Sequence, residues 1–302
     1  MFAQLNWVGE PNTLSPDHVA WQVIELVAEA SRKSITATET DGTGAYSYDT
    51  LHTSIRHATQ AAGVITDVAP AFPAPSGPPA SAALRRIIHQ RRSALDLDGR
   101  TEIDRDLFYR ILAKTLPGQG PFRLWPWPPQ LHLALFVHRV QGLAPGLYLL
   151  ARDPEQTEAL RTAMRREFIW QQPEACPAEL HLYQLKLEDT RAVSAQVSCQ
   201  QLIAAEGCFS LGMLVNFIEP LQQYGAWFYP RLFWESGLIG QVLYLEAEAA
   251  GIRGTGIGCF FDDPVHTLFG LADFQYQSLY HFTLGGPVDD PRLTTLSAYP
   301  GL

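Results

Sequence analysis

Two short segments, far apart in the chain, carry residue types suited to holding a phosphorylated, flat ligand. The first contains Arg91, Arg92 and Ser93, which follow a short helical pattern. Guanidinium groups bind phosphate oxygens in pairs, and a neighbouring hydroxyl adds a further donor, so this group suits a phosphate. The alternative is an exposed cluster whose positive charge compensates the negative end of the preceding helix.

The second segment spans residues 250–260 and contains Gly251, Gly254, Gly256 and Gly258. Glycines let the backbone approach a flat ligand closely and direct N–H groups at it. A Rossmann dinucleotide loop needs a strand before its glycines and a helix after them, whereas a helical pattern precedes this run. Nicotinamide binding by this loop is therefore disfavoured. The structural alternative is a helix end, with Gly251 in a left-handed conformation, followed by a flexible turn.

Other side chains with catalytic potential show no recognisable arrangement. There is no Gly-x-Ser-x-Gly segment, and nothing marks a Ser-His-Asp triad. His132 and His138 share one face of a predicted strand, which indicates a structural role. His266 and His281 flank the last predicted strands and are candidates for lining a pocket.

The cysteines are predicted to be free and buried. They lie at positions without paired spacing or an adjacent histidine pattern, which disfavours a disulfide or a zinc site. Cys259, beside the glycines, is interpreted as a small buried residue rather than a redox thiol. The four residues are Cys176, Cys199, Cys208 and Cys259.

Composition excludes several classes of partner. The net charge of the 302 residues is −9, and the 22 Lys and Arg residues are scattered. Binding to nucleic acid would need a basic stripe. The longest apolar run, residues 237–242, is too short to span a bilayer, and no charged-then-apolar leader opens the chain. We expect a cytoplasmic protein that binds neither nucleic acid nor membrane.

The chain divides into a linker-like N-terminal extension, residues 1–80, and a folded domain, residues 81–302. The extension is predicted to carry one or two helices. Residues 16–30 have a helical pattern with Ser15 as N-cap, and residues 69–80 form a proline-rich connector.

The folded domain mixes helices and strands without strict alternation. Helices are predicted over residues 82–90, 104–114, 196–205 and 238–250, with Asp104 as a cap. Strands are predicted over residues 131–140, 146–150, 180–186, 256–261 and 279–284, whereas residues 208–217 fit either state. The first two strands are predicted to form a hairpin. This order indicates an α+β fold rather than a doubly wound parallel sheet.

Taken in order, these elements resemble the nitroreductase family of flavin enzymes, and more closely its branch of azoline-oxidising dehydrogenases from peptide-modifying clusters. The resemblance covers about residues 84–297. It rests on the arginine-serine group, the glycines after a long apolar helix, and a set of later residues. These later residues are Asp262, Asp263, Pro264, the strand up to Gly285, Gly286, Pro287 and Arg292.

The resemblance implies a three-layer α/β/α sandwich with a mostly antiparallel central sheet. It also implies a flavin mononucleotide (FMN) cofactor and hydride transfer through flavin N5 to or from a small organic substrate. NAD(P)H is a transient reductant in this interpretation. No side chain is predicted to be a catalytic nucleophile, and no metal ligand is predicted.

The resemblance also implies cofactor-binding residues. In the family, the arginine-serine group holds the phosphate and ribityl end, the glycine-rich strand follows the isoalloxazine edge, and a late basic residue meets the phosphate. Carried over, these roles fall on Arg91, Arg92, Ser93, Gly256, Ile257, Gly258, Cys259 and Arg292. Gln200, predicted to lie at the start of the central helix, is a candidate for the ribityl or pyrimidine edge.

One segment departs from the family pattern. Where the family has a Pro-Ser motif that covers the partner's flavin, residues 116–129 contain prolines, Trp125 and Trp127 but no serine. The chain thus resembles the C-terminal half of a tandem nitroreductase-like protein, in which a second nitroreductase-like half, or a separate partner subunit, completes the site. A homodimer is the competing arrangement. A non-catalytic half that scaffolds a partner is the alternative.

Aromatic residues gather before the long apolar helix. Such clusters are typical of a core or a subunit interface, and in a flavin enzyme they also suit the wall of a substrate pocket. The residues are Trp227, Phe228, Tyr229, Phe233 and Trp234.

Overall fold

A computed structural model describes residues 13, 15–17, 19–33 and 80–294. Most of the N-terminal extension, including the proline-rich connector up to residue 79, lies outside these residues. Helix α1 (Gln22–Ala30) begins later than predicted, after an extended Trp21. Ser15 is not its N-cap, because the Ser15 hydroxyl instead donates to the carbonyl of Asp17 within a local turn (3.0 Å).

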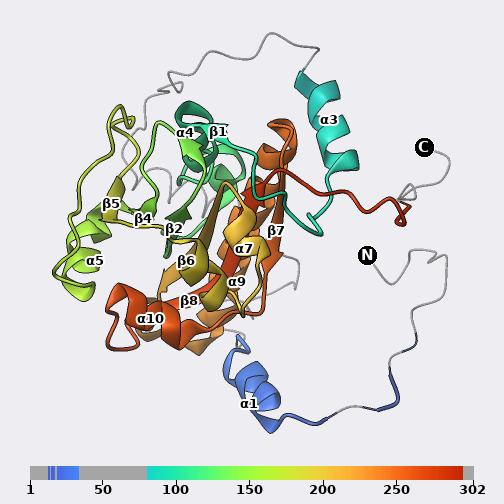
Figure 1. The fold of residues 1–302 in the computed structure, drawn as a ribbon. Helices are drawn as coiled ribbons and strands as arrows, with labels where there is room; N and C mark the ends of the chain where they lie inside the picture. The colour runs from blue at the N-terminus through green and yellow to red at the C-terminus, as the bar shows by residue number, and fades with distance from the viewer. Residues whose placement is uncertain (1–12, 14, 18, 34–79, 295–302) are drawn as a thin grey trace.

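A six-stranded antiparallel sheet forms the centre of the domain, in the order β5-β4-β2-β6-β8-β7 (Figure 1). Its strands are β2 (Leu131–Val137), β4 (Gly146–Leu150), β5 (Leu182–Leu187), β6 (Phe209–Asn216), β7 (Arg253–Ile257) and β8 (Tyr276–Gly285). The predicted hairpin is confirmed by the antiparallel pairing of β2 with β4. The ambiguous residues 208–217 form β6, which is buried along its whole length.

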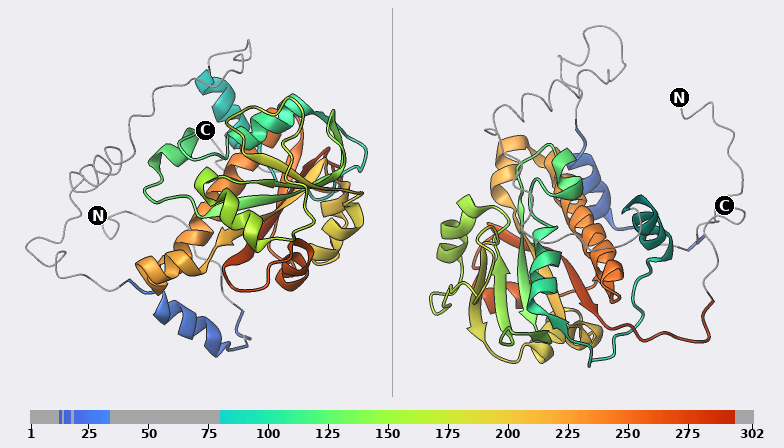
Figure 2. Two further views of the ribbon diagram at one scale, coloured as in Figure 1. Left: turned by 90° about the vertical axis from the view of Figure 1, so that its left-hand side faces the viewer. Right: turned by 90° about the horizontal axis from the view of Figure 1, so that it is seen from above.

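Helices cover both faces of this sheet. Alternate residues of β2 belong to two different hydrophobic clusters, because side chains of a strand point to opposite faces. Leu133 and Leu135 pack in the cluster that includes residues of α4 (Arg105–Ala113) and α9 (Tyr229–Ala249). Ala134 and Phe136 pack in the cluster formed with α5 (Thr157–Ala163) and α10 (Asp262–Phe269). Figure 2 shows α9 along one face of the sheet. The predicted three-layer α+β sandwich is thus confirmed.

Further elements connect these layers. The remaining helices of the described domain are α3 (Ala80–Gln90), η3 (Gly120–Leu124), η4 (Pro154–Gln156), α5 (Thr157–Ala163), α6 (Arg191–Val197), α7 (Ile203–Glu206), α8 (Ile218–Tyr224), η5 (Ala226–Phe228) and α10 (Asp262–Phe269). Strands β1 (Ile103–Asp104) and β3 (Val140–Gln141) form a small parallel pair. Asp104 caps α4 as predicted, since its carboxylate accepts from the Leu107 amide (2.7 Å).

Several boundaries differ from the prediction, three of them near the candidate site or α9. Residues 196–205 are not one helix, because Cys199 and Gln200 adopt left-handed backbone angles (φ 59° and 60°) between α6 and α7. The strand predicted over residues 256–261 is β7, which ends at Ile257. Helix α9 begins at Tyr229, well before residue 238, and Pro230 in its first turn fits a helix start.

The end of α9 forms a complete Schellman motif, as predicted from Gly251. Gly251 has φ 73°, and its amide donates to the Glu248 carbonyl (3.2 Å). The Ile252 amide donates to the Ala247 carbonyl (3.0 Å). This cap turns the chain directly from α9 into β7, so the helix fixes where the glycine-rich strand starts.

The two ends of the folded domain lie side by side. Leu97 and Pro287 form an antiparallel bridge, and the Asp98 amide donates to the Gly286 carbonyl (2.9 Å). The segment that leaves β8 therefore runs beside the segment that follows α3 (Figure 1). A side chain at position 286 would collide with Thr101, so glycine is required there.

A buried ion pair anchors α9 against the sheet. Arg152 and Glu235 are paired, with their side chains at most 1% exposed. Arg152 also donates to the Thr115 carbonyl (2.7 Å), and Glu235 accepts from the Gln130 amide (3.0 Å). Loss of either partner would leave a buried charge without compensation. Among the described helices, none is both long and apolar enough to cross a membrane.

Candidate functional site

Tyr244 joins the two segments that the sequence analysis singled out. Its hydroxyl lies 2.9 Å from the Ser93 hydroxyl and accepts a hydrogen bond from the Gly256 amide (2.9 Å). The Ala94 amide donates to the Gly254 carbonyl (3.0 Å), which adds a backbone contact. Sequence reasoning missed Tyr244. No local signal marked it, because a tyrosine within a largely apolar helix is ordinary core material.

The two arginines beside this junction take different positions. The Arg91 guanidinium stacks over the Tyr244 ring, 4.8 Å from its centroid. Arg92 folds back onto the end of α3, where it donates to the carbonyls of His89 (3.0 Å) and Arg91 (2.7 Å). Within the described residues, neither arginine pairs with a carboxylate, so their charges can meet an anion.

Strand β7 is an edge strand, which leaves one row of its backbone groups directed away from the sheet. The Gly254 carbonyl and the Gly256 amide belong to this row, since Ala94 and Tyr244 bind them. Gly258 follows directly after the end of β7. Gly258 is exposed, and a Cβ added there would touch only Tyr280, at 3.5 Å. This backbone row suits the edge of a flat ligand.

The first two glycines of the row have a packing reason as well. A Cβ at Gly254 would lie 2.6 Å from a ring carbon of Phe282, and one at Gly256 would lie 2.6 Å from the Tyr280 hydroxyl. Ile257, between the row positions, is buried in the core. The buried Phe282 ring thus requires glycine at position 254 independently of any ligand, and Tyr280 would have to move to admit a side chain at position 256.

Cys259 is exposed, so its prediction as a buried residue is wrong. The segment beyond β7 turns outward there and meets the loop between α6 and α7. Gln201 Nε2 donates to the Cys259 carbonyl (3.1 Å), and the Phe261 amide donates to the Val197 carbonyl (2.8 Å). The Cys259 and Cys199 sulfur atoms lie 2.6 Å apart. All four cysteines are free, as predicted, although only Cys208 is fully buried.

Gln200 and Arg292 occupy less defined positions. Gln200 is exposed in the left-handed turn rather than at a helix start, next to the residue that contacts Cys259. Arg292 is 87% exposed and pairs with Asp290 on its own turn (2.7 Å). Among the described contacts, none joins Arg292 to Arg91 or Arg92. The structure therefore brings Arg91, Ser93 and Gly256 together through Tyr244, and leaves Arg292 apart.

The buried histidines are structural. His138 contacts the Ala204 carbonyl (3.1 Å) and the Thr190 hydroxyl (3.1 Å), and burial lowers its pKa to about 4. Burial, with the nearby Arg152 charge, lowers the pKa of His132 to about 3. Both residues have the structural role that was predicted.

The pocket-lining interpretation of His281 is wrong because its side chain is fully buried, whereas that of His266, which is partly exposed, stays a prediction. His281 is 1% exposed and contacts the hydroxyls of Ser198 (3.1 Å) and Ser278 (3.2 Å) with its two ring nitrogens. Burial lowers its pKa to about 4. His266 accepts a hydrogen bond from the Ser278 amide (3.2 Å), and burial lowers its pKa too.

The aromatic cluster at the start of α9 divides between core and surface, since Trp227 and Phe228 pack in or against the core whereas Phe233 and Trp234 are exposed. Phe228 is buried, and its ring stacks on Tyr224 (4.6 Å) and meets Trp127 edge-on (5.9 Å). Trp234 is 52% exposed. Trp127, from the segment without serines, is partly buried and packs against the core beside η5.

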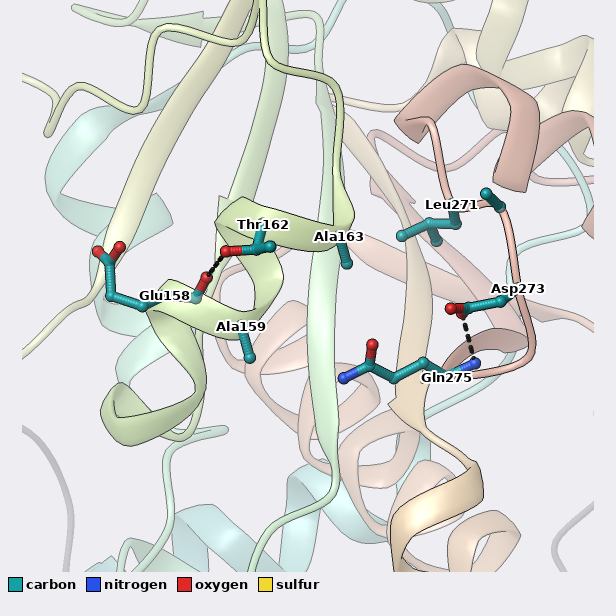
Figure 3. Close-up of a pocket in the computed structure, with 8 residues that line it drawn as sticks. Glu158, Ala159, Thr162, Ala163, Leu271, Asp273 and Gln275 are labelled. Atoms are coloured by element: carbon teal, nitrogen blue, oxygen red, sulfur yellow. Dashed lines mark hydrogen bonds between the residues drawn. The ribbon is translucent and has the colours of Figure 1, made fainter.

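An open depression lies elsewhere on the molecule, between α5 and the loop before β8 (Figure 3). Ala159, Ala163 and Leu271 line it, and the Asp273 carboxylate accepts a hydrogen bond from the Gln275 backbone amide (2.8 Å). None of the predicted site residues contributes to it. We therefore place the candidate site at the Tyr244 junction and the outer edge of β7.

Comparison with known proteins identifies the fold. No family model matches the chain, and a search of curated proteins found no match. A protein from Anabaena variabilis assigned as a nitroreductase aligns with 24% identity and a TM-score of 0.53, over 68% of this chain and 38% of that one. A chain of the E. coli microcin synthetase McbBCD complex with truncated pro-MccB17 bound aligns with 12% identity and a TM-score of 0.50, over 89% and 93%.

The chain therefore has a nitroreductase-like fold, as its motifs predicted. It spans little more than a third of the length of the Anabaena protein. At these identities the similarity defines the architecture only, and the chemistry has to be argued from the site.

Proposed function

We propose that the chain is an FMN-dependent oxidoreductase of nitroreductase type. FMN would bind between the arginine-serine segment and the outer edge of β7. The observation that carries this proposal is the Tyr244 hydroxyl, which contacts both Ser93 and the Gly256 amide and so holds the two segments together. When bound, the flavin supplies hydride transfer at its N5 to or from a small organic substrate.

The donors of the site fit the cofactor. Arg91 and Arg92 supply two guanidinium groups without carboxylate partners in the described structure, which suits the phosphate. Tyr244 can accept from Gly256 and donate to Ser93, which leaves the Ser93 hydroxyl hydrogen for the ligand. The amide of exposed Gly258, directly after β7, would donate to the isoalloxazine edge near N5.

The remaining predicted residues have smaller roles in this proposal. Ile257 supports β7 from the core, Cys259 and Gln200 border the outer end of the edge strand, and Arg292 would have to leave Asp290 to reach the phosphate. NAD(P)H is the proposed transient reductant. A homodimer partner, or a second nitroreductase-like half, would cover the flavin. Residues 1–80 are proposed as a connector to the domain of residues 81–302.

A scaffold function is the second candidate, and a specific observation favours it. The segment that carries a Pro-Ser motif in the family here contains Trp125 and Trp127, whose rings meet edge-on at 5.1 Å. Trp127 packs against the core instead of leaving room for a ligand contact. Such a chain would supply an interface to a partner and bind no flavin itself.

Titration with FMN and with riboflavin separates these functions and tests the phosphate assignment. We expect wild-type chain to bind FMN more tightly than riboflavin. Arg92→Ala should weaken FMN binding about 10- to 100-fold, the range for a charge-assisted contact, without changing riboflavin binding. Arg100→Ala, an exposed arginine nearby, is the matched control and should bind both ligands like wild type. Equal losses for both ligands would contradict the phosphate role, and no binding of either would favour the scaffold.

A further inference from the structure

Two cysteines that the candidate flavin site does not use as thiols lie in direct contact. Cys199 stands in the turn between α6 and α7, and Cys259 follows β7, 60 residues later. Their sulfur atoms are 2.6 Å apart, closer than the usual contact of two non-bonded sulfurs and longer than a disulfide bond of about 2.05 Å. Little movement is needed to join them.

The backbone around both cysteines is held in place from several directions. The Phe261 amide donates to the Val197 carbonyl (2.8 Å), and Gln201 Nε2 bridges the carbonyls of Ser198 (3.0 Å) and Cys259 (3.1 Å). The Ser198 hydroxyl contacts buried His281 (3.1 Å). The two thiols are therefore brought together by contacts other than their own.

Cys199 also has an unusual backbone conformation. Cys199 and Gln200 are consecutive non-glycine residues with φ near 60°. L-residues rarely adopt this region, and they persist there where the surrounding structure imposes it. The left-handed turn places the Cys199 side chain toward Cys259. A local geometry maintained against backbone preference indicates a functional site.

The pair is accessible from solvent. Cys259 is exposed and Cys199 is partly exposed, unlike Cys208 in the core. The hydrogen bond with Cys259 raises the pKa of the Cys199 thiol. Because Cys259 is the more exposed of the two, it is suited to attack an external disulfide first, and Cys199 to attack second.

We propose that Cys199 and Cys259 form a redox-active dithiol that low-molecular-weight disulfides oxidise to an intramolecular disulfide. The Cys259 thiolate attacks one sulfur of the external disulfide, which forms a mixed disulfide and releases one thiol. The Cys199 thiolate then attacks the Cys259 sulfur, forms the Cys199–Cys259 bond and releases the second thiol. The two cysteine protons leave with these thiols, and the external disulfide gains the two electrons. This proposal does not depend on flavin binding.

The disulfide would also stabilise the domain. It would tie the outer end of β7 to the turn between α6 and α7 across a long stretch of chain. Constraint of the unfolded chain by such a link should raise the melting temperature by about 5–10 °C. The difference between reduced and oxidised chain is therefore a second measure of the same bond.

The experiment uses the full chain, reduced with dithiothreitol, desalted and equilibrated with glutathione disulfide. Alkylation, intact mass and peptide mapping then locate the oxidised residues. We expect two of the four cysteines to become protected, with one cross-linked peptide that joins residues 199 and 259. The Cys199→Ser variant should accumulate a mixed disulfide with glutathione at Cys259. Cys176→Ser, which leaves the pair intact, should behave like wild type.

A second variant tests the same disulfide. Cys259→Ala should show no protected pair and no change of melting temperature with oxidant, and it serves where Cys199→Ser fails to fold. If all four cysteines of the wild-type chain can still be alkylated after treatment with excess glutathione disulfide, the proposal is wrong. A cross-link that involves Cys176 or Cys208, or an unchanged melting temperature after oxidation, would overturn it as well.

Discussion

The two ends of the glycine-rich segment have different surroundings. Gly254 and Gly256 lie against Phe282 and Tyr280 of β8 and are bonded from outside by Ala94 and Tyr244. Gly258 and the residue after it are exposed, and the chain there meets the turn between α6 and α7. One glycine pattern therefore serves two purposes: close packing at its first end, and access to the backbone at its second.

The largest effect expected from this comparison is on stability at the packed end. A Cβ at position 254 would lie 2.6 Å from Phe282 and 3.3 Å from the Thr283 carbonyl, and neither residue is exposed. Gly254→Val should lower the free energy of unfolding by about 3 kcal/mol, typical of an overpacked core. Urea denaturation measures it. Gly258→Ala is the control and should change stability by less than about 0.5 kcal/mol. Equal losses of stability in the two variants would contradict the difference in packing between the two ends of the segment.

A pH effect of intermediate size is expected at the open end, which His281 supports through Ser198. Burial lowers the pKa of His281 from 6.5 to about 4. Between these values the unfolded chain binds the proton and the folded chain does not. The stabilisation is therefore full above pH 6.5 and is lost as the pH falls toward 4. The contribution of His281 should be about 2 kcal/mol.

Melting curves at pH 7 and pH 4.5 test this effect. The His281→Asn variant should lose less stability than wild type over this interval, because Asn does not titrate. Burial also lowers the pKa values of His138 and His132, so the stability of both wild type and the variant should still decrease at pH 4.5. An identical decrease in the variant and wild type would contradict the role of neutral His281.

The smallest predicted effect concerns the hydroxyl that connects the two segments. Tyr244→Phe keeps the ring beneath Arg91 but removes the partner of Ser93 and of the Gly256 amide. We expect a loss of about 1 kcal/mol in the free energy of unfolding, the usual value of one hydrogen bond. FMN affinity should also fall. Tyr183→Phe on the opposite edge strand, β5, should change neither quantity. A Tyr244→Phe variant with wild-type FMN affinity would show that the junction does not position the site.

Local patterns predicted most of the fold, whereas long-range contacts were beyond them. The β2–β4 hairpin, the Asp104 cap and the Gly251 helix end each depend on residues close in sequence. The helix predicted over residues 196–205 was wrong because the left-handed turn at Cys199 is stabilised from residues 259–261. Ser15 failed as a cap because its hydroxyl has a nearer partner.

The candidate site follows the same division. The types of Arg91, Ser93 and Gly256 indicated a ligand, and the sequence placed them at both ends of one domain. Tyr244 could not be singled out, since tyrosine within an apolar helix is ordinary core material. The contact of Cys199 with Cys259 has no spacing signal, because it arises only when β7 and the turn after α6 meet in the folded domain.

The visible absorbance of the purified chain after incubation with FMN and gel filtration tests the central claim most directly. The account predicts a yellow protein that retains FMN at about one per chain and releases it intact on heating. A chain that elutes colourless, while remaining folded by circular dichroism, would contradict flavin binding by this chain alone and assign it the scaffold function.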